Sequence, residues 1–227
     1  MEGSETSLII FQANVNSARS RKDQLLLKIN KIKQHGKVPI ILLNDTRLHD
    51  KVEFDIDGFS TYRRDHSSNT HFAGGVAILV PDQLTVIEIN TAKNLPIETL
   101  ILDITVDNMK LRICTTYPHP GQLLSEDLFD LLDSMNSANV TVLMGDLNCH
   151  LGLLPNHIVN RSGHVLKNLI DTYGYKMMND LELTYFCNSS SREELLDICL
   201  MKETQTNLSS GTPRRRLEVN TFQQYLR

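Results

Sequence analysis

The chain has 227 residues and a mass of 25.8 kDa, and 41% of its residues are hydrophobic and 22% charged. These values fit one α/β domain and exclude a wholly disordered chain. The longest apolar runs, VPIILL (38–43) and GVAILV (75–80), are too short to span a bilayer, and the start MEGSETSLII lacks the basic cluster of a secretory signal. We therefore expect an intracellular protein, nuclear or cytoplasmic and not secreted, without membrane contact.

The net charge of −4 excludes a general nucleic-acid coat, so any contact with phosphates must be local. The charge is uneven: residues 19–37 carry a net +6 and residues 198–227 a net +3. The basic stretch at 19–37 is either a solvated helix face or a contact to the DNA backbone. An acidic body that handles a polyanion needs a divalent metal to neutralise some of its carboxylates.

The four cysteines show no metal-finger spacing and no C-x-x-C pair. Their positions are Cys114, Cys149, Cys187 and Cys199. Buried thiols in a reducing compartment are favoured over disulfides.

Apolar runs with β-type patterning predict strands, in chain order, at 8–13, 38–43, 75–80, 84–90, 97–104, 110–117, 140–144, 175–178, 184–187 and 195–200. Helices are expected over 21–35, capped by Ser20, from Ser125 onward, and over about 163–173, where Gly174 ends the last one. Asp107-Asn108 predicts a hairpin turn.

Hairpins mixed with βα units favour an α/β (α+β) domain with a mixed sheet rather than a fully parallel one. We assign residues 1–200 to this domain. Residues 201–227 form an atypical basic tail that we expect to be exposed or disordered. Within that tail, 217–227 fits either a strand or a frayed helix.

Polar residues lie where several predicted strands end. Asn14 and Asn16 follow the first strand, and Asp45 follows the second. Asp146 and Asn148 follow the strand at 140–144. Ligands of layered α/β folds bind where strand ends converge, and carboxylates with carboxamides suit a hard ion such as Mg²⁺.

Each of these pieces has an ordinary structural alternative. Asp-x-Asn after a strand is usually a turn former, and Asn-Asp-Thr usually forms an Asx turn or a helix cap. Tyr117 ends the strand at 110–117 and by default is a packed aromatic. Asp197 stands in the apolar run ELLDICL, where the ordinary alternative is a structural ion pair.

The order of the motifs is far more specific than any single one. Taken together, the sequence resembles the endonuclease/exonuclease/phosphatase superfamily, and it is most similar to the apurinic-type endonuclease domain of non-LTR retrotransposons. The matching segments cover about residues 8–200 and are FQANVNS, LLNDTRL, GGVAILV, TTYPHP, VLMGDLNCH, NRSGHVL, LTYF and ELLDICL. The resemblance implies a four-layer α/β-sandwich with two mixed β-sheets flanked by helices.

The resemblance also implies metal-assisted attack of water on a phosphodiester, with Mg²⁺ or Mn²⁺ as the cofactor and DNA as the partner. Asn14 would contact the attacked phosphate group, and Asn16 would support the metal and the substrate. Asp45 stands where the family has its metal-binding glutamate. Tyr117 would donate to a phosphate oxygen, and Asp146 would orient or deprotonate the attacking water.

Three further roles come from the same resemblance. Asn148 would stabilise the transition state beside Asp146, and Thr184 would touch the phosphate. Asp197 would hold a catalytic histidine in the right tautomer. In the parent element such a domain is linked to a reverse transcriptase.

The sequence departs from the family at several points. The family's terminal Ser-Asp-His is missing: no histidine follows His164, and the expected place near position 222 reads Asn220-Thr221-Phe222. Asp45 is one methylene shorter than the family's glutamate, and metal ligation tolerates little change in reach. Glu194 stands where the family often has serine. His150, directly after Asn148, is expected to serve the loop's structure rather than to replace the lost histidine.

Three functions follow from these observations. The first is a weakened Mg²⁺-dependent DNA endonuclease of retrotransposon origin, since loss of a general acid or base costs about 10²–10⁴ in rate. The second is an inactive remnant or domesticated module that binds nucleic acid or protein. The third keeps the fold but acts on other phosphate esters, as phosphatases do. A cluster at Arg214–Arg216 is a weak indication of nuclear import or nucleic-acid binding.

Overall fold

The structure is a computed structural model, and its description covers most of the chain. The described residues are 7–66, 73–107, 109–135, 137–153, 158–179, 185–187, 192–204 and 217–221. Asn108, Thr184 and the cluster Arg214–Arg216 lie outside these ranges.

The first sheet has the strand order β13-β1-β2-β4-β3. Its strands are β1 (Ser7–Asn14), β2 (Lys37–Asn44), β3 (Phe59–Arg64), β4 (Val76–Pro81) and β13 (Leu217–Thr221). β1 runs parallel to both β2 and β13, whereas β4 is antiparallel to β2 and β3. The sheet is therefore mixed, and its central strands β1 and β2 end at the same edge.

The second sheet has the order β5-β6-β7-β8-β12-β9. Its strands are β5 (Thr85–Glu88), β6 (Glu98–Val106), β7 (Met109–Tyr117), β8 (Val140–Asp146), β9 (Lys176–Met177) and β12 (Asp197–Glu203). Only β7 and β8 are parallel neighbours within it. A separate hairpin joins β10 (Tyr185–Cys187) to β11 (Arg192–Glu194).

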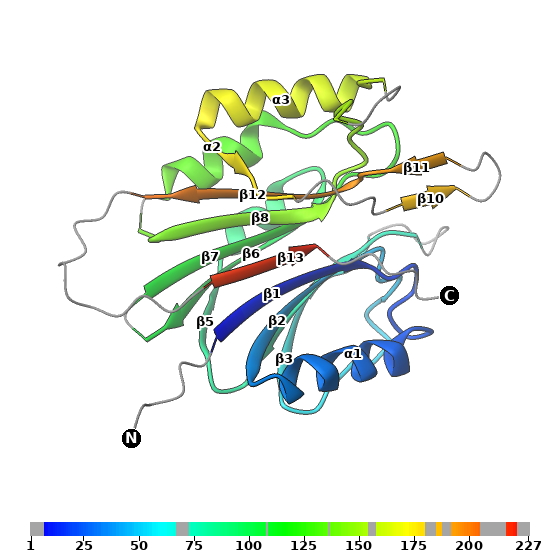
Figure 1. Ribbon diagram of the computed structural model, residues 1–227, viewed down its shortest axis with the longest axis vertical. Coiled ribbons are helices and arrows are strands. Elements are labelled where there is room, and N and C mark those ends of the chain that lie inside the picture. Colours follow the sequence, from blue (N-terminus) through cyan, green and yellow to red (C-terminus); the bar gives the residue numbers. More distant parts are fainter. Residues whose placement is uncertain are drawn as a thin grey trace.

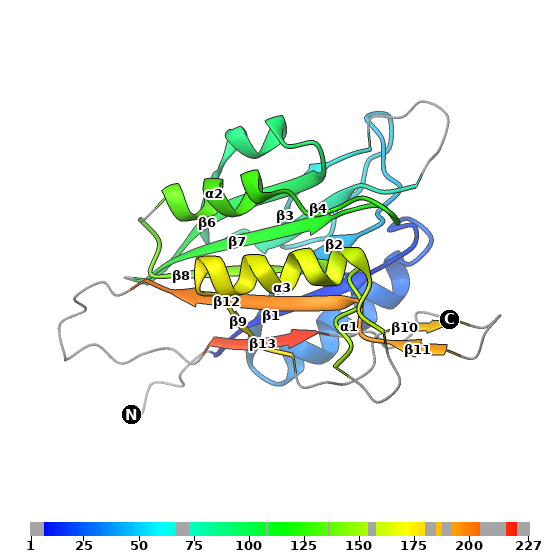
Figure 2. The same cartoon turned by 90° about the horizontal axis from the view of Figure 1, so that it is seen from above.

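The helices cover the outer faces of the two sheets (Figure 1). α1 (Lys22–Gln34) packs on the first sheet, and α2 (Glu126–Ser134) and α3 (Arg161–Tyr173) pack on the second. Seen from above, α2 and α3 lie in front of the second sheet (Figure 2). A 3₁₀ helix, η1 (Asn90–Asn94), precedes β6. The expected sandwich of two mixed sheets flanked by helices is confirmed. No helix within the described ranges is long and apolar enough to cross a membrane.

Three hydrophobic cores separate the four layers, and the two-residue period of each strand decides which core a side chain enters. In β1, Leu8 and Ile10 lie between the sheets, whereas Ile9 and Phe11 face α1. The other central strands alternate in the same way. Burial on both faces explains why these strands appear in the sequence as continuous apolar runs.

Most predicted elements form, and the differences concern one helix cap, two unpredicted strands and the undecided segment. One of the unpredicted strands, β11, is three residues long. Ser20 does not cap α1, because the helix begins one residue later and its N-cap, Arg21, makes no side-chain capping bond. β3 was not predicted, because its sequence FSTYRR is half polar and the strand lies at a sheet edge. Residues 217–221 of the undecided segment are a strand, since they pair with the exposed side of β1. The boundary at residue 200 remains a prediction, although β12 continues past it to Glu203.

Cys114, Cys149 and Cys199 are free and buried, as expected. Burial raises the pKa of the Cys149 and Cys199 thiols to about 12, so neither is a reactive thiolate at neutral pH.

A buried ion pair between Arg112 and Asp103 connects β7 to β6. Arg112, only 1% exposed, donates two bonds to Asp103 at 2.7 and 2.8 Å and a third to the carbonyl of Met135. Lys110 reaches the same carboxylate at 3.4 Å. The bidentate geometry compensates for the desolvation of both charges.

We expect Arg112→Leu to lower the free energy of unfolding by about 3–5 kcal/mol, because it leaves the Asp103 carboxylate buried with a single cation. Urea denaturation measures the loss. The double variant Arg112→Leu/Asp103→Leu should recover much of it. The control Lys93→Ala, which breaks the surface ion pair with Glu88, should cost less than about 1 kcal/mol. Equal losses in Arg112→Leu and in the double variant would contradict the argument.

Candidate active site

The polar side chains of the candidate site lie on the faces of their strands that point toward the other sheet. Gln12 and Asn14 continue the series Leu8, Ile10 on the inter-sheet face of β1. Asn44 continues Ile40, Leu42 in β2 in the same way. A polar cluster therefore closes one end of the inter-sheet core.

The second sheet contributes polar side chains to the same end of the core. They too continue series of apolar side chains that lie between the sheets. Asp146 follows Val142 and Met144 in β8, and Tyr117 follows Leu111 and Ile113 in β7. The antiparallel neighbours contribute their first residues instead. Asp197 opens β12 opposite Asp146, and Glu98 opens β6 opposite Tyr117. The direction of each strand thus decides whether its first or last residue reaches the site.

The side chain of Asn44 makes four hydrogen bonds within this polar cluster. Its Oδ1 accepts from Gln12 Nε2 at 2.8 Å and from the backbone N–H of Asp146 at 3.1 Å. Its Nδ2 donates to Thr115 Oγ1 at 3.2 Å and to the Thr116 carbonyl at 3.3 Å. This fully buried carboxamide therefore ties the first sheet to both parallel strands of the second.

Asp146 is the buried carboxylate at the centre of the site. Its Oδ2 accepts from Asn14 Nδ2 at 2.7 Å, and its Oδ1 accepts from the backbone N–H of Asn148 at 3.1 Å. Burial raises the pKa of Asp146 to about 6; the two hydrogen bonds oppose this shift and the charge of Asp45 adds to it. The carboxylate can therefore take up a proton near neutral pH.

Tyr117 lies beside the two carboxylates. Burial is the main cause that raises the pKa of its phenol, and the charges of Asp45 and Asp146 raise it further. The hydroxyl stays protonated at neutral pH, so it is available as a hydrogen-bond donor.

Asn148 is held in place by the loop after β8. Its positive φ of 50° directs its Nδ2 to the carbonyl of Pro118 at 2.9 Å. Asn160, the N-cap of α3, accepts from the N–H groups of Gly163 and His150 and donates to the Asn148 carbonyl. The loop contacts His150 through its backbone N–H, and the structural role of its side chain stays a prediction.

Asp45 is engaged by its neighbours. Its Oδ1 accepts from the backbone N–H of Gly74 at 2.7 Å, and its Oδ2 lies 3.1 Å from Arg47 Nη2. Its oxygens match Mg²⁺ or Mn²⁺ in chemical type. Arg47 competes for this negative charge, and its side chain is 40% exposed.

Asp197 is fully buried, and its Oδ1 accepts from Gln12 Nε2 at 2.8 Å. Gln12 therefore contacts the carboxylate that, by the resemblance, would orient a catalytic histidine. Beyond it, β13 places Thr221 opposite Gln12 and ends there.

The structure brings Asn14, Tyr117, Asp146, Asn148 and Asp197 to one end of the sheets, with Asp45 next to them. Asn16 is exposed, has a φ of 44°, and contacts the site through its backbone N–H, which donates to Asn14 Oδ1. Sequence reasoning missed Gln12, Asn44 and Arg47. Gln12 and Asn44 could have been found from the sequence, because each is a polar residue that continues the two-residue alternation of buried apolar side chains, as in LIIFQ.

We expect Asp146 to make the wild type lose stability as pH rises. A carboxyl group with a pKa near 6 in the folded state and about 3.9 when unfolded favours folding while protonated. This contribution is complete below about pH 4 and is lost through pH 6. Relative to Asp146→Asn, the wild type should lose about 2–3 kcal/mol of unfolding free energy between pH 4 and 7.

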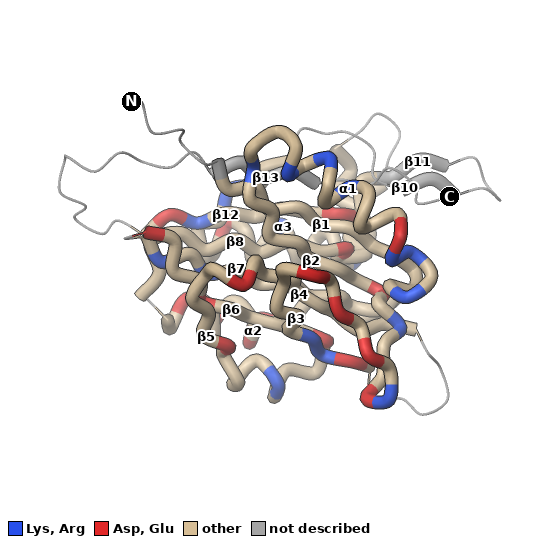
Figure 3. Tube along the Cα trace, turned by 90° about the horizontal axis from the view of Figure 1, so that it is seen from below, with Lys and Arg blue, Asp and Glu red and all other residues tan. Residues whose placement is uncertain are grey.

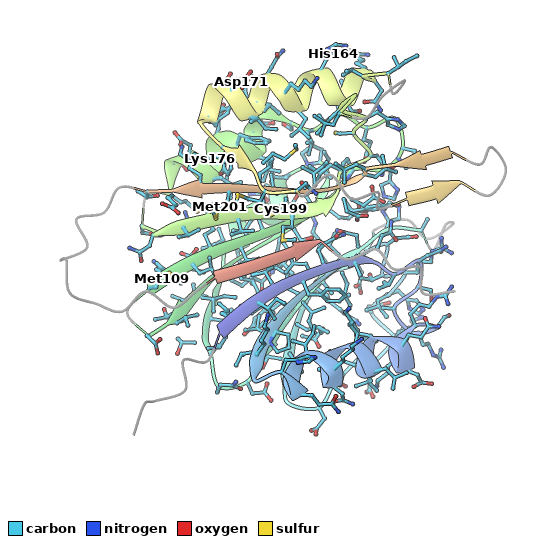
Figure 4. The ribbon with its side chains drawn as sticks, viewed as in Figure 1. Met109, His164, Asp171, Lys176, Cys199 and Met201 are labelled. Carbon is cyan, nitrogen blue, oxygen red and sulfur yellow. The ribbon has the colours of Figure 1, made fainter. Side chains whose placement is uncertain are left out.

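Urea denaturation at a series of pH values, without divalent metal, measures this difference. Asp171→Asn is the control, because Asp171 is an exposed carboxylate on α3 (Figure 4). Parallel pH profiles for the wild type and Asp146→Asn would refute the shifted pKa.

Comparison with solved structures found the same fold in nucleases and related enzymes. The endonuclease domain of TRAS1, a telomere-specific non-LTR retrotransposon, superposes with a TM-score of 0.65 and 14% identity, over 86% of this chain and 84% of that one. The 3′ phosphatase NExo from Neisseria, bound to a product DNA hairpin, gives 0.57 and 18%, over 85% of each chain. An AP endonuclease from Archaeoglobus fulgidus gives 0.52 and 17%, over 86% of each.

At these identities the structural matches establish the fold alone. A comparison with curated proteins found no match. The family model described as Endonuclease-reverse transcriptase matches residues 111–219, which include β7, β8, β12 and the segments TTYPHP, VLMGDLNCH and ELLDICL. This match and the shared fold bear out the resemblance to the endonuclease/exonuclease/phosphatase superfamily.

Proposed function

We propose that the chain is a metal-dependent phosphodiester hydrolase of the DNA endonuclease type, of retrotransposon origin and with weakened catalysis. The observation that carries the proposal is the 2.7 Å contact between Asn14 and Asp146, beside Tyr117 and Asn148, where the strands of both sheets end. In support, one similar structure is a retrotransposon endonuclease and another was solved with DNA.

In this proposal Asp146 is the base for the attacking water. Its pKa near 6 leaves it ionised at neutral pH yet basic enough to take up a proton. Asn14 and the backbone N–H of Asn148 hold the two carboxylate oxygens in a fixed orientation. Water attack on phosphorus gains from such positioning.

In this proposal Tyr117 and Asn148 bind the phosphate. The protonated phenol of Tyr117 donates to a phosphate oxygen, and the Asn148 amide approaches charge that develops in the transition state. Thr184, outside the described residues, remains a predicted phosphate contact. The acidic surroundings of Asp45 and Asp146 require a cation before a phosphate can enter.

Asp45 would hold that cation, Mg²⁺ or Mn²⁺, with help from Asn16. When bound, the ion supplies Lewis-acid stabilisation of the phosphate charge. Arg47 must then leave the carboxylate, and its guanidinium becomes available to the DNA backbone.

Catalysis is expected to be weak because the chain has no histidine after His164. Gln12 holds Asp197 through a neutral amide, which cannot carry a proton to the leaving group or stabilise charge as an imidazolium does. The expected cost is about 10²–10⁴ in rate.

A module that binds nucleic acid without cutting it is the second candidate. The pairing of Asp45 with Arg47 and of Asp197 with Gln12 favours it, since both carboxylates are held by side chains of the chain itself. The basic stretch on α1 gives it little support. Lys22, Lys28 and Lys33 lie over the rings of Phe54, Phe11 and Phe59, and Figure 3 shows basic and acidic segments interspersed on this side. Partnership with a reverse transcriptase and the cellular compartment stay proposals.

We expect the purified chain to nick supercoiled plasmid and abasic-site DNA slowly in Mg²⁺ or Mn²⁺, and Asp146→Ala to abolish the nicking, because the variant removes the base. Gel electrophoresis of the plasmid forms measures the rate, and DNA ending in a 3′ phosphate tests the phosphatase alternative. Asp171→Ala serves as the matched surface control. If the wild type cuts no faster than Asp146→Ala while both bind DNA, the binding module is the correct function.

We expect Arg47→Ala to strengthen Mn²⁺ binding about threefold to tenfold, because it frees the Asp45 carboxylate from its competing cation. Isothermal titration with Mn²⁺ measures the affinity. Arg21→Ala, which removes a guanidinium near the start of α1, is the control and should leave it unchanged. An unchanged affinity in Arg47→Ala would argue against Asp45 as a ligand.

A further inference from the structure

We infer that His66, Glu98 and His119 form a binding site for Zn²⁺ or a similar transition-metal ion, separate from the hard-ion site at Asp45. His66 follows β3 of the first sheet, Glu98 opens β6, and His119 comes two residues after β7 of the second sheet. A metal ion held by all three would therefore link the two sheets.

The ligand atoms are close to a metal-binding arrangement. One nitrogen from each imidazole and one carboxylate oxygen lie within 4.8 Å of one another. His119 Nε2 lies 3.1 Å from Glu98 Oε2, and His66 Nδ1 contacts Glu98 Oε1. Tetrahedral zinc with bonds of 2.0–2.1 Å separates its ligand atoms by about 3.3 Å. Small side-chain rotations are enough to bring all three onto one ion.

The donor set selects the kind of metal. Two imidazoles with one carboxylate suit Zn²⁺ and its neighbours in the first transition row, whereas Mg²⁺ prefers oxygen alone. The side chains of His66 and His119 are 26% and 24% exposed, so an ion can enter from solvent. Three protein ligands leave a fourth position for water.

The surroundings favour a built site over a chance cluster. A Cβ on Gly74 would lie 2.7 Å from His119 Cε1, so glycine at this position makes room for the ring. Arg64, at the end of β3, donates to the carbonyls of Ala92, Leu95 and Ile97 just before β6. These bonds hold the end of β3, two residues before His66, against the segment that leads into Glu98. Among the described residues, this is the one group of three His, Cys, Asp or Glu side chains near enough to hold a metal.

The site adjoins the candidate active site. The His119 ring meets Tyr117 edge-on with centroids 5.3 Å apart, and Gly74 donates its N–H to Asp45. A bound ion would fix His119 and, through these contacts, the approach to Tyr117 and Asp45. Its role is therefore to hold the edge where the two sheets meet.

The test is Zn²⁺ binding by the full chain after treatment with a chelator. We expect about one tightly bound equivalent of Zn²⁺ by elemental analysis after dialysis, a rise in the unfolding midpoint on the order of 5 °C, and no such rise with Mg²⁺. His66→Asn and His119→Asn should each lower Zn²⁺ affinity at least tenfold. His164→Asn is the matched control, because His164 points to solvent from α3 on the far side of the second sheet (Figure 4).

Co²⁺ in place of Zn²⁺ gives a second measurement that needs no variant. Visible d–d bands of a tetrahedral ion with nitrogen ligands, lost on addition of Zn²⁺, would support the site. An octahedral aquo spectrum, or Zn²⁺ binding that is the same in the wild type and both histidine variants, would overturn it and leave Glu98 as a plain ion-pair partner of two histidines.

Discussion

The buried carboxamide of Asn44 is the interaction on which the site depends. It uses both lone pairs and both N–H groups between the two sheets, with Gln12 and the Asp146 backbone as donors and Thr115 and Thr116 as acceptors. A buried amide of this kind specifies one register, because any slip leaves polar groups unpaired in the core. The contact joins the two sheets directly at the backbone of Asp146.

Close backbone approach at the same place supports this constraint. A Cβ on Gly145 would lie 2.3 Å from the Thr116 carbonyl, so only glycine lets β8 pass β7 at this distance. The residue before Asp146 is therefore required for the packing that buries the carboxylate. Burial in turn raises the pKa of Asp146, so a packing requirement sets the chemistry of the proposed base.

Much of the fold could be predicted, because strands buried on both faces have a strong local signature. Two strands were missed: β3 is half polar, and β11 is only three residues long. The undecided 217–221 becomes a strand because β1 offers it an open edge. The convergence of the predicted site residues also followed from strand ends. Their partners were missed. Gln12 carries a signal in the sequence, as a polar residue that alternates with buried apolar neighbours, whereas Arg47 looks like an ordinary surface residue.

Three things follow from the sequence by itself: the order of the motifs, the faces of the strands on which polar and apolar side chains lie, and the absence of a histidine after His164. Only the tertiary structure decided which polar groups meet. Gln12 and Asp197 are 185 residues apart, and His66 and Glu98 come from different sheets. Such contacts depend on strand order and direction across the whole chain, and local patterning carries no information about either.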